Sequence, residues 1–228
     1  MLKKDGFMSK RAVCIISGGM DSALAAQMAK EEGYEIIALH FNYGQRTEKK
    51  ELESFRKIAK HLDASESYEI DLPFFEQIGA SALTDKSIDV PTGGLEEGVP
   101  LTYVPFRNGI FLSIAAAIAE KHGAEAIYIG VVEEDSSGYP DCRESYIQKM
   151  QEAVNLGTKE ETAIEIKMPL VTLKKSQIAQ KALTLGVPLE YTWSCYQDEE
   201  RACGVCDSCR LRLKGFKGAG AVDPIDYR

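Results

Sequence analysis

A short string of serines, glycines and an aspartate follows the first strongly apolar run of the chain. Residues 12–16 are apolar, the string SGGMDS occupies residues 17–22, and apolar residues then recur at helical spacing. A loop between a strand and a helix gathers backbone N–H groups at the positive end of the helix dipole, which favours anions. Two adjacent glycines let the backbone approach phosphate oxygens closely. The string predicts a phosphate-binding loop, although the same residue types also form ordinary turns and helix caps.

Three side chains of this loop add specific chemistry. The hydroxyls of Ser17 and Ser22 can donate hydrogen bonds to phosphate, whereas the acidic Asp21 is better suited to hold Mg²⁺ or to cap the loop. The sequence has no GxxxxGK[ST] string, so this is not the P-loop of kinases and GTPases. Strand, SGGxDS and helix in this order resemble the loop of the N-type ATP pyrophosphatases, the PP-loop superfamily. The resemblance implies cleavage of ATP between its α- and β-phosphates and adenylation of an acceptor oxygen.

Four of the six cysteines lie close together near the C-terminus, with the spacing C-x7-C-x2-C-x2-C. They are Cys195, Cys203, Cys206 and Cys209. Four thiolates complete a tetrahedral zinc ion and leave no open position, so the pattern predicts a structural zinc site. An iron–sulfur cluster is the alternative, but the seven-residue gap and the lack of a Cys-Pro pair favour zinc. Clustered cysteines in an otherwise cysteine-poor chain also indicate a reducing compartment, and we expect a cytoplasmic protein.

Several basic residues stand where strands end or helices begin. Arg46 follows the second expected strand, at the sheet edge where ligands of α/β proteins bind. Arg107 and Asn108 open an apolar helix, and Lys174 and Lys175 open a later one, where the helix dipole disfavours cations. A functional interpretation assigns the cations to phosphate or a substrate carboxylate. The ordinary alternatives are solvent exposure for Arg46 and a helix cap for Asn108.

The string GVVEEDSSGYPDCR at residues 130–143 gathers polar side chains behind the fourth expected strand. Its carboxylates are acceptors that match the N–H edge of a guanine-like ring, and an aromatic side chain can stack on such a ring. The string therefore predicts a substrate loop at the same sheet edge as the phosphate loop. A merely solvated acidic loop is the alternative.

These residues need a scaffold, and the hydrophobic pattern predicts an α/β fold. Apolar runs at residues 12–16, 35–41, 66–70, 126–132 and 164–168 read as buried strands. Segments of helical period lie between them, at residues 22–33, 47–61, 106–122, 144–156 and 174–185. The alternation is typical of a Rossmann-like parallel sheet with helices on both faces. A Pro- and Gly-rich stretch at residues 81–104 is expected to be a lid or binding loop.

Composition narrows the class of protein further. The chain has 228 residues, 27 basic and 35 acidic side chains and a net charge of −8, which argues against a protein that coats nucleic acid. The first residues have charges but no signal-peptide core, and no apolar run approaches a membrane span. Met8 is an alternative start to Met1. We expect a nucleotide-binding domain at residues 1–190 and a cysteine-rich segment at residues 191–228.

Together the strings SGGMDS, NYGQR, TYVPFRN, GVVEEDSSGYPDCR and C-x7-CGVCDSC resemble one family, the 7-cyano-7-deazaguanine synthases of queuosine biosynthesis. The resemblance implies a fold like that of the adenine nucleotide alpha hydrolases, a homodimer, and one structural zinc ion per subunit on the four cysteines. It also implies an ATP site on the loop and first helical turns. These residues are Ile16, Ser17, Gly18, Gly19, Met20, Asp21, Ser22, Ala23, Leu24, Ala25 and Ala26.

The implied reaction converts 7-carboxy-7-deazaguanine, ammonia and ATP into the 7-nitrile, AMP and pyrophosphate. The carboxylate is adenylated, ammonia gives the amide, and activation of the amide oxygen then leads to the nitrile. The resemblance assigns Lys175 to the developing phosphate charge, and we place Asp21 and Arg107 with it as catalytic residues. The expected substrate-binding residues are Arg46, Asp135, Ser137, Tyr139, Asp141 and Arg143.

Two other functions remain open at this point. One is a different adenylating enzyme of the superfamily, either an amide-forming synthetase or an enzyme that acts on tRNA, although the chain has no sizeable basic extension. The other is a nucleotide-binding zinc module without catalysis. We expect small-molecule substrates, no direct contact with nucleic acid and no membrane association.

Overall fold

A single parallel sheet organises the protein. The computed structural model describes residues 10–93, 98–133 and 138–228. Five strands pair in the order β3-β2-β1-β4-β5, and all four pairings are parallel. The strands are β1 (Arg11–Ile15), β2 (Glu35–Asn42), β3 (Glu66–Asp71), β4 (Ala126–Tyr128) and β5 (Glu165–Lys167).

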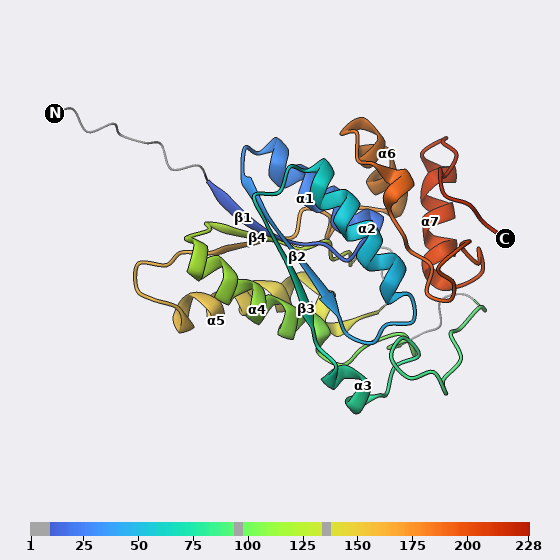
Figure 1. Ribbon diagram of the computed structural model, residues 1–228, viewed down its shortest axis with the longest axis horizontal. Coiled ribbons are helices and arrows are strands. Elements are labelled where there is room, and N and C mark those ends of the chain that lie inside the picture. Colours follow the sequence, from blue (N-terminus) through green and yellow to red (C-terminus); the bar gives the residue numbers. More distant parts are fainter. Residues whose placement is uncertain (1–9, 94–97, 134–137) are drawn as a thin grey trace.

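Helices cover both faces of this sheet (Figure 1). Helices α1 (Met20–Glu31), α2 (Glu48–His61) and α6 (Lys175–Thr184) lie on one face, and α4 (Arg107–His122) and α5 (Glu144–Gly157) lie on the other. Helix α3 (Phe74–Ile78) follows β3, and α7 (Asp207–Gly218) follows the cysteine-rich segment. Two 3-10 turns, η1 (Pro140–Cys142) and η2 (Leu189–Tyr191), complete the elements. The Rossmann-like α/β architecture predicted from the sequence is confirmed.

Alternation along the central strands builds two separate hydrophobic layers. Val13 and Ile15 of β1 pack with α4 and α5, whereas Ala12 and Cys14 face α1, α2 and α6. Successive side chains of a strand point to opposite faces, so a strand buried on both sides needs an unbroken apolar run. That requirement explains why residues 12–16 carry no polar side chain. The predicted phosphate loop at residues 17–22 begins where this apolar run ends.

Four elements differ notably from the sequence prediction. Strand β4 ends at Tyr128 rather than at residue 132, because the chain leaves the ladder there and runs along the pocket. Helix α4 begins after Phe106, which adopts a left-handed conformation (φ 56°) at the N-cap. Helices α3 and α7 were not predicted. Among the described residues, no helix is long and apolar enough to cross a membrane.

The C-terminal segment packs tightly against α6 through glycines of α7. A Cβ atom on Gly215 would lie 2.8 Å from Lys175 Cγ, and one on Gly218 would lie 2.7 Å from Ser176 Cβ. The buried Arg212 side chain pairs with Asp223 at 2.7 Å and so ties the last residues to α7. The segment at residues 191–228 therefore lies directly on the preceding α/β unit, and residues of both line the pocket described below.

Candidate active site and metal centre

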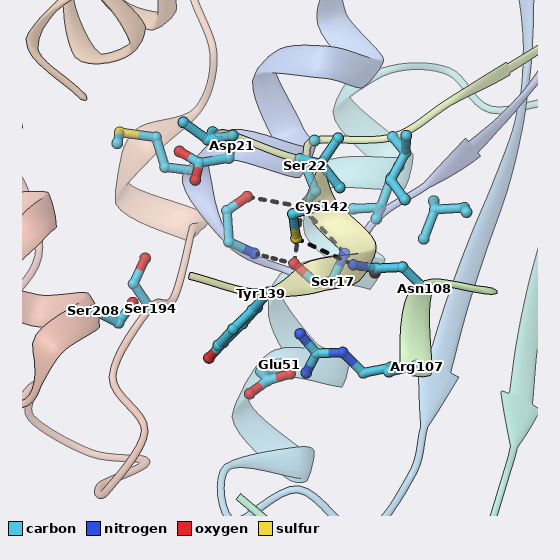
Figure 2. A pocket seen from close by; sticks show the side chains of 18 of the residues that line it. Ser17, Asp21, Ser22, Glu51, Arg107, Asn108, Tyr139, Cys142, Ser194 and Ser208 are labelled. Carbon is cyan, nitrogen blue, oxygen red and sulfur yellow. Dashed lines mark hydrogen bonds between the residues drawn. The ribbon is translucent and has the colours of Figure 1, made fainter. Parts of the chain in front are cut away.

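A pocket of about 260 Å³ opens at the carboxyl ends of β1 and β4. These two strands are adjacent in the sheet, while their connections run to opposite sides. Open α/β sheets bind their ligands at such a switch point. The lining includes Ile15 and Ser17 from the end of β1, Ile129 and Gly130 from the end of β4, and Ser194 from the C-terminal segment (Figure 2).

Hydrogen bonds shape the loop between β1 and α1 before any ligand binds. The backbone N–H of Ser17 donates to Ser22 Oγ at 3.1 Å, and Ser22 Oγ donates to the carbonyl of Gly19 at 3.0 Å. The two serine hydroxyl oxygens lie 3.0 Å apart. The loop is thus closed by its own side chains at the N-terminus of α1, an arrangement suited to an anion.

Two glycines allow this loop its close neighbours. Gly18 has a φ of +91°, and a Cβ atom there would lie 2.6 Å from the carbonyl oxygen of Glu51 in α2. Gly130, after β4, leaves room for the first turn of α1, because a Cβ atom there would lie 2.7 Å from the backbone nitrogen of Ser22. The phosphate loop is therefore packed between α2 and the end of β4.

The structure brings two of the predicted catalytic residues together. Lys175 Nζ, at the start of α6, lies 2.5 Å from Asp21 Oδ2, in the first turn of α1. Their side chains are 12% and 27% exposed, and both residues line the pocket. Asp21 Oδ1 is buried and has no hydrogen-bond partner among the described residues. One carboxylate oxygen thus pairs with the lysine and the other is left for a ligand.

The residues predicted for ATP divide into two groups. Ile16, Ser17, Gly19, Met20, Asp21 and Ser22 line the pocket. Gly18 shapes the turn without lining it, and the four residues 23–26 are buried in the core behind the first turn of α1. The second group can support the loop through packing but offers no side chain to the pocket.

Arg107, the third predicted catalytic residue, supplies a permanent positive charge to the pocket. Its Nη1 donates to the hydroxyl of Tyr43 at 2.7 Å, and its guanidinium lies 5.3 Å from the centre of the Tyr43 ring. Burial alone would lower the pKa of this group. The oxygens of Tyr43, Tyr139, Tyr196 and Asp141 outweigh that effect and raise it. Arg107 therefore stays protonated although it is surrounded by aromatic rings.

Arg46, predicted to bind substrate, is not among the residues that line the pocket. Its guanidinium donates to the carbonyls of Ala82 at 2.7 Å, Asp85 at 3.1 Å and Ile88 at 2.6 Å. Three backbone acceptors in one loop satisfy most of the donors that an arginine offers. The structure gives Arg46 the role of holding the segment that follows α3.

The predicted substrate loop contributes less of the pocket than expected. Asp135 and Ser137 lie outside the described residues. Tyr139 lines the pocket, and its hydroxyl is tied to Thr102 Oγ1 at 2.8 Å. Asp141 points instead to the start of α4, where Oδ2 accepts the backbone N–H of Asn108 at 2.9 Å. Arg143 is exposed at the N-cap of α5 and does not line the pocket. The structure thus places Asp141 and Arg143 at helix ends, and neither lines the pocket.

Asn108 and Cys142 meet at the same helix end. Asn108 Nδ2 lies 3.3 Å from Cys142 Sγ, which also lines the pocket (Figure 2). Burial raises the pKa of this thiol to about 12. Since the thiolate is the nucleophilic form, Cys142 is not an activated nucleophile.

Sequence reasoning missed several residues that line the pocket. They include Tyr43, Glu51, Tyr196, Ser194, Ser208 and Arg212. Glu51 is one of many charged residues on an amphipathic helix, and nothing local distinguishes it from its neighbours. Arg212 is not free for a ligand, because its donors are used by Asp223, Thr192, Ser194 and Leu189. The sequence signal closest to Tyr43 and Glu51 is the string NYGQR at residues 42–46, which lies just before α2.

The four cysteines form a closed, buried cluster beside the pocket. All four Sγ atoms lie within 4.8 Å of one another, and those of Cys203 and Cys209 are 3.9 Å apart. Backbone N–H groups of Gln197 and Cys203 donate to Cys195 Sγ at 3.4 and 3.3 Å. Four thiolates about 2.3 Å from one centre would have this spacing, so the cluster fits a metal ion without an open position.

Comparison with known proteins agrees with these features. The family model for the queuosine biosynthesis protein QueC matches residues 11–220. A 7-cyano-7-deazaguanine synthase of Sulfurovum sp. (strain NBC37-1) is 82% identical over 97% of this chain and 100% of its own length. Another, from Aliarcobacter butzleri (strain RM4018), is 69% identical over 96% of each chain.

Among solved structures, a 4-thiouridine synthetase in complex with RNA and bound ATP has a similar fold. It aligns with a TM-score of 0.54 and 22% identity, over 92% of this chain and 50% of that one. The family match covers most of the 228 residues, and the two relatives match over 100% and 96% of their own lengths. The chain therefore belongs to the QueC family of queuosine biosynthesis proteins.

Proposed function

We propose that this protein is a 7-cyano-7-deazaguanine synthase that converts 7-carboxy-7-deazaguanine and ammonia into the nitrile at the expense of ATP. The observation that carries the proposal is the pocket itself. It joins a serine- and glycine-rich anion loop, the Asp21–Lys175 pair and a wall of aromatic side chains. The relatives that share 69–82% of their residues carry this activity in their names.

The reaction uses the same activation twice. First, a carboxylate oxygen of the substrate attacks the α-phosphorus of ATP, which forms an acyl adenylate and releases pyrophosphate. Ammonia displaces AMP and loses a proton to give the amide. The amide oxygen then attacks the α-phosphorus of a second ATP and releases a second pyrophosphate. Loss of AMP from carbon and of protons from nitrogen leaves the carbon–nitrogen triple bond. Each step replaces a poor leaving group by AMP, and no redox partner is needed.

The residues of the pocket supply the positions and charges for both activations. The backbone N–H groups and hydroxyls of the loop at residues 17–22 bind phosphate oxygens. Lys175 stabilises the negative charge that develops on the phosphates, and Asp21 holds the lysine in place until then. Arg107, half-buried among tyrosines, binds an anionic oxygen of the substrate, and Tyr139 supports the planar ring.

Two metal ions belong to the proposal. Asp21 Oδ1, buried and without a partner among the described residues, fits a ligand of the Mg²⁺ that accompanies ATP. Zinc on Cys195, Cys203, Cys206 and Cys209 would fasten the start of α7 against the pocket, since Cys206 is its N-cap and Cys209 lies in its first turn. Zinc would have a structural role, because four cysteine ligands leave no open position for a reacting group.

We also propose a cytoplasmic homodimer that acts on small molecules without binding nucleic acid. The net charge of −8 supports the last point. Three large apolar side chains close together in the sequence support a second copy as a neighbour, because Val99, Leu101 and Phe106 are 56%, 56% and 53% exposed.

A substrate panel tests the proposed function. Purified protein is incubated with ATP, Mg²⁺ and an ammonium salt, together with 7-carboxy-7-deazaguanine, other aromatic carboxylates, or tRNA. We expect AMP and the nitrile only with the deazaguanine carboxylate. AMP release only with another carboxylate, or only with tRNA, would assign the chain a different substrate.

A further inference from the structure

Glu51 is a pocket carboxylate that the proposed chemistry leaves without a role. It lies in the first turn of α2 and lines the pocket together with Arg107 and Tyr139. Its backbone carbonyl is the group that packs against Gly18 of the phosphate loop. In Figure 2 the Glu51 carboxylate and the Arg107 guanidinium both point into the cavity below the loop. A carboxyl group at this position can accept hydrogen bonds from a substrate.

Two buried side chains fix the plane of this carboxylate. Thr47 Oγ1 donates to Oε1 at 2.7 Å, and Gln45 Nε2 donates to Oε2 at 3.2 Å. Thr47 is 1% exposed and Gln45 is 5% exposed, so neither moves freely. Each carboxylate oxygen has further acceptor capacity. Glu51 therefore offers two parallel acceptors in a fixed orientation.

The surroundings of Glu51 suit a flat, polar ring. Phe41, Tyr43, Phe111, Tyr139 and Tyr196 all contribute to the pocket lining. The Phe41 and Phe111 rings stack with centroids 4.0 Å apart, and Tyr43 meets Phe111 at 5.7 Å. Rigid aromatic walls hold planar heterocycles well. Arg107 already places a positive charge in the same pocket as Glu51. Repulsion between like charges therefore disfavours a second cation, such as ammonium, beside Glu51.

We propose that Glu51 determines substrate specificity by accepting the ring N–H and the adjacent exocyclic amino group of the 2-aminopyrimidinone edge of the substrate. This inference rests on the proposed function. It moves the acceptor role to α2 from the loop at residues 133–143, whose described carboxylates Glu133 and Asp141 accept backbone N–H groups of Glu144 in α5 and Asn108 in α4. Two N–H donors side by side match a carboxylate whose two oxygens are held in one plane.

A two-by-two comparison tests this role. The two substrates are 7-carboxy-7-deazaguanine and the analogue that lacks the 2-amino group, and the proteins are wild type, Glu51→Ala and the isosteric Glu51→Gln. A hydrogen bond to a charged group changes kcat/KM on the order of 10- to 100-fold, so wild type should prefer the natural substrate by that factor. Both Glu51 variants should lose most of this preference, while the KM for ATP and for ammonium stays within about threefold.

Glu53→Gln is the matched control, because Glu53 lies on the same helix, is exposed and pairs only with Lys50 and Lys57 in the hydrogen bonds described. It should keep the full preference. If Glu51→Gln, folded and ATP-binding, discriminates as wild type does, the inference is wrong. A rise in the KM for ammonium with unchanged discrimination would assign Glu51 to ammonia instead. Absence of turnover by wild type would contradict the proposed function itself, which separates the two failures.

Discussion

Lys175 Nζ lies 2.5 Å from Asp21 Oδ2, although 154 residues separate the two positions in the sequence. The pair links the first turn of α1 to the first turn of α6, at the mouth of the phosphate loop. The unfavourable position of a cation at the N-terminus of a helix is offset by this carboxylate. An incoming phosphate would compete for the same lysine, so the pair keeps Lys175 oriented between turnovers.

Replacement of either member should abolish most activity with little loss of stability. We expect Lys175→Met and Asp21→Asn each to lower kcat about 100- to 1,000-fold. The first removes the cation that stabilises the developing phosphate charge, and the second removes the carboxylate that holds this cation in place. A partly exposed ion pair contributes about 1 kcal/mol or less to folding. Lys174→Met, which alters an exposed neighbour, is the control and should retain activity. Full activity of Asp21→Asn would show that the loop has been assigned the wrong task.

The close approach of Gly130 to α1 gives a second prediction. A methyl group at this position would meet Ser22 N at 2.7 Å and must displace the first turn of α1. We expect Gly130→Ala to lower the free energy of unfolding by about 1–3 kcal/mol and to weaken ATP binding with it. In Gly157→Ala the added atom meets nothing within 4 Å, so this variant should behave as wild type. Urea denaturation measures the unfolding free energy of the two variants, and calorimetric titration with ATP measures their affinity for the nucleotide.

The stability of the protein should depend on pH through Glu51. Burial raises the pKa of its carboxyl from 4.5 to about 7, against the opposing effects of Thr47, Gln45 and Arg107, while Glu48 raises it further. The folded state therefore holds this proton more tightly than the unfolded state. Stability attributable to Glu51 is greatest below pH 4.5 and falls as the pH rises to about 7.

Glu51→Gln removes that dependence. Relative to wild type, the variant should gain up to about 3 kcal/mol of unfolding free energy between pH 4.5 and pH 8, measured by urea denaturation at several pH values. In Glu53→Gln, where two lysines lower the pKa of the native carboxyl, no such gain should occur in this window. A difference between Glu51→Gln and wild type that is constant with pH would mean that Glu51 is ionised throughout.

Loss of one cysteine ligand should release the metal and loosen α7. We expect Cys206→Ser to lose bound zinc and to be destabilised by at least about 3 kcal/mol, roughly 6–12 °C in Tm. Cys14→Ala removes a buried thiol outside the cluster and should keep its metal. Elemental analysis and thermal unfolding give the readouts. If the purified protein contains iron and sulfide and has a broad visible absorption band, the four cysteines bind an iron–sulfur cluster and the zinc assignment is wrong.

The sequence was informative where function depends on short segments and uninformative where it depends on packing. The strand, loop and helix around Ser17 and Asp21 are encoded within about two dozen residues, and the observed strand Arg11–Ile15 and helix Met20–Glu31 lie close to the predicted bounds 12–16 and 22–33. Strand β4 was predicted too long because residues 129–132 stay apolar after the ladder ends at Tyr128, where they line the pocket instead. Hydrophobic pattern reports burial, not pairing.

The residues that were missed or misplaced have a common cause. Glu51 reaches the pocket only because α2 packs against Gly18, and Arg46 is diverted to the loop at residues 82–88, so both outcomes depend on contacts between distant segments. Helix α7 was missed because its buried face, which includes Cys209, Arg212 and Phe216, does not follow the usual apolar pattern. For Glu51 and Arg46, the charge of the side chain did not indicate whether it lies in the pocket.

The ratio of AMP to nitrile tests the central claim most directly. Purified protein is supplied with 7-carboxy-7-deazaguanine, excess ATP, Mg²⁺ and an ammonium salt, and AMP, pyrophosphate and nitrile are quantified over several turnovers. Activation of the carboxylate and then of the amide at one site predicts two AMP and two pyrophosphate per nitrile, with the free amide accepted as a substrate at one AMP per nitrile. One AMP per molecule of product, with the amide as the end product, would contradict the account.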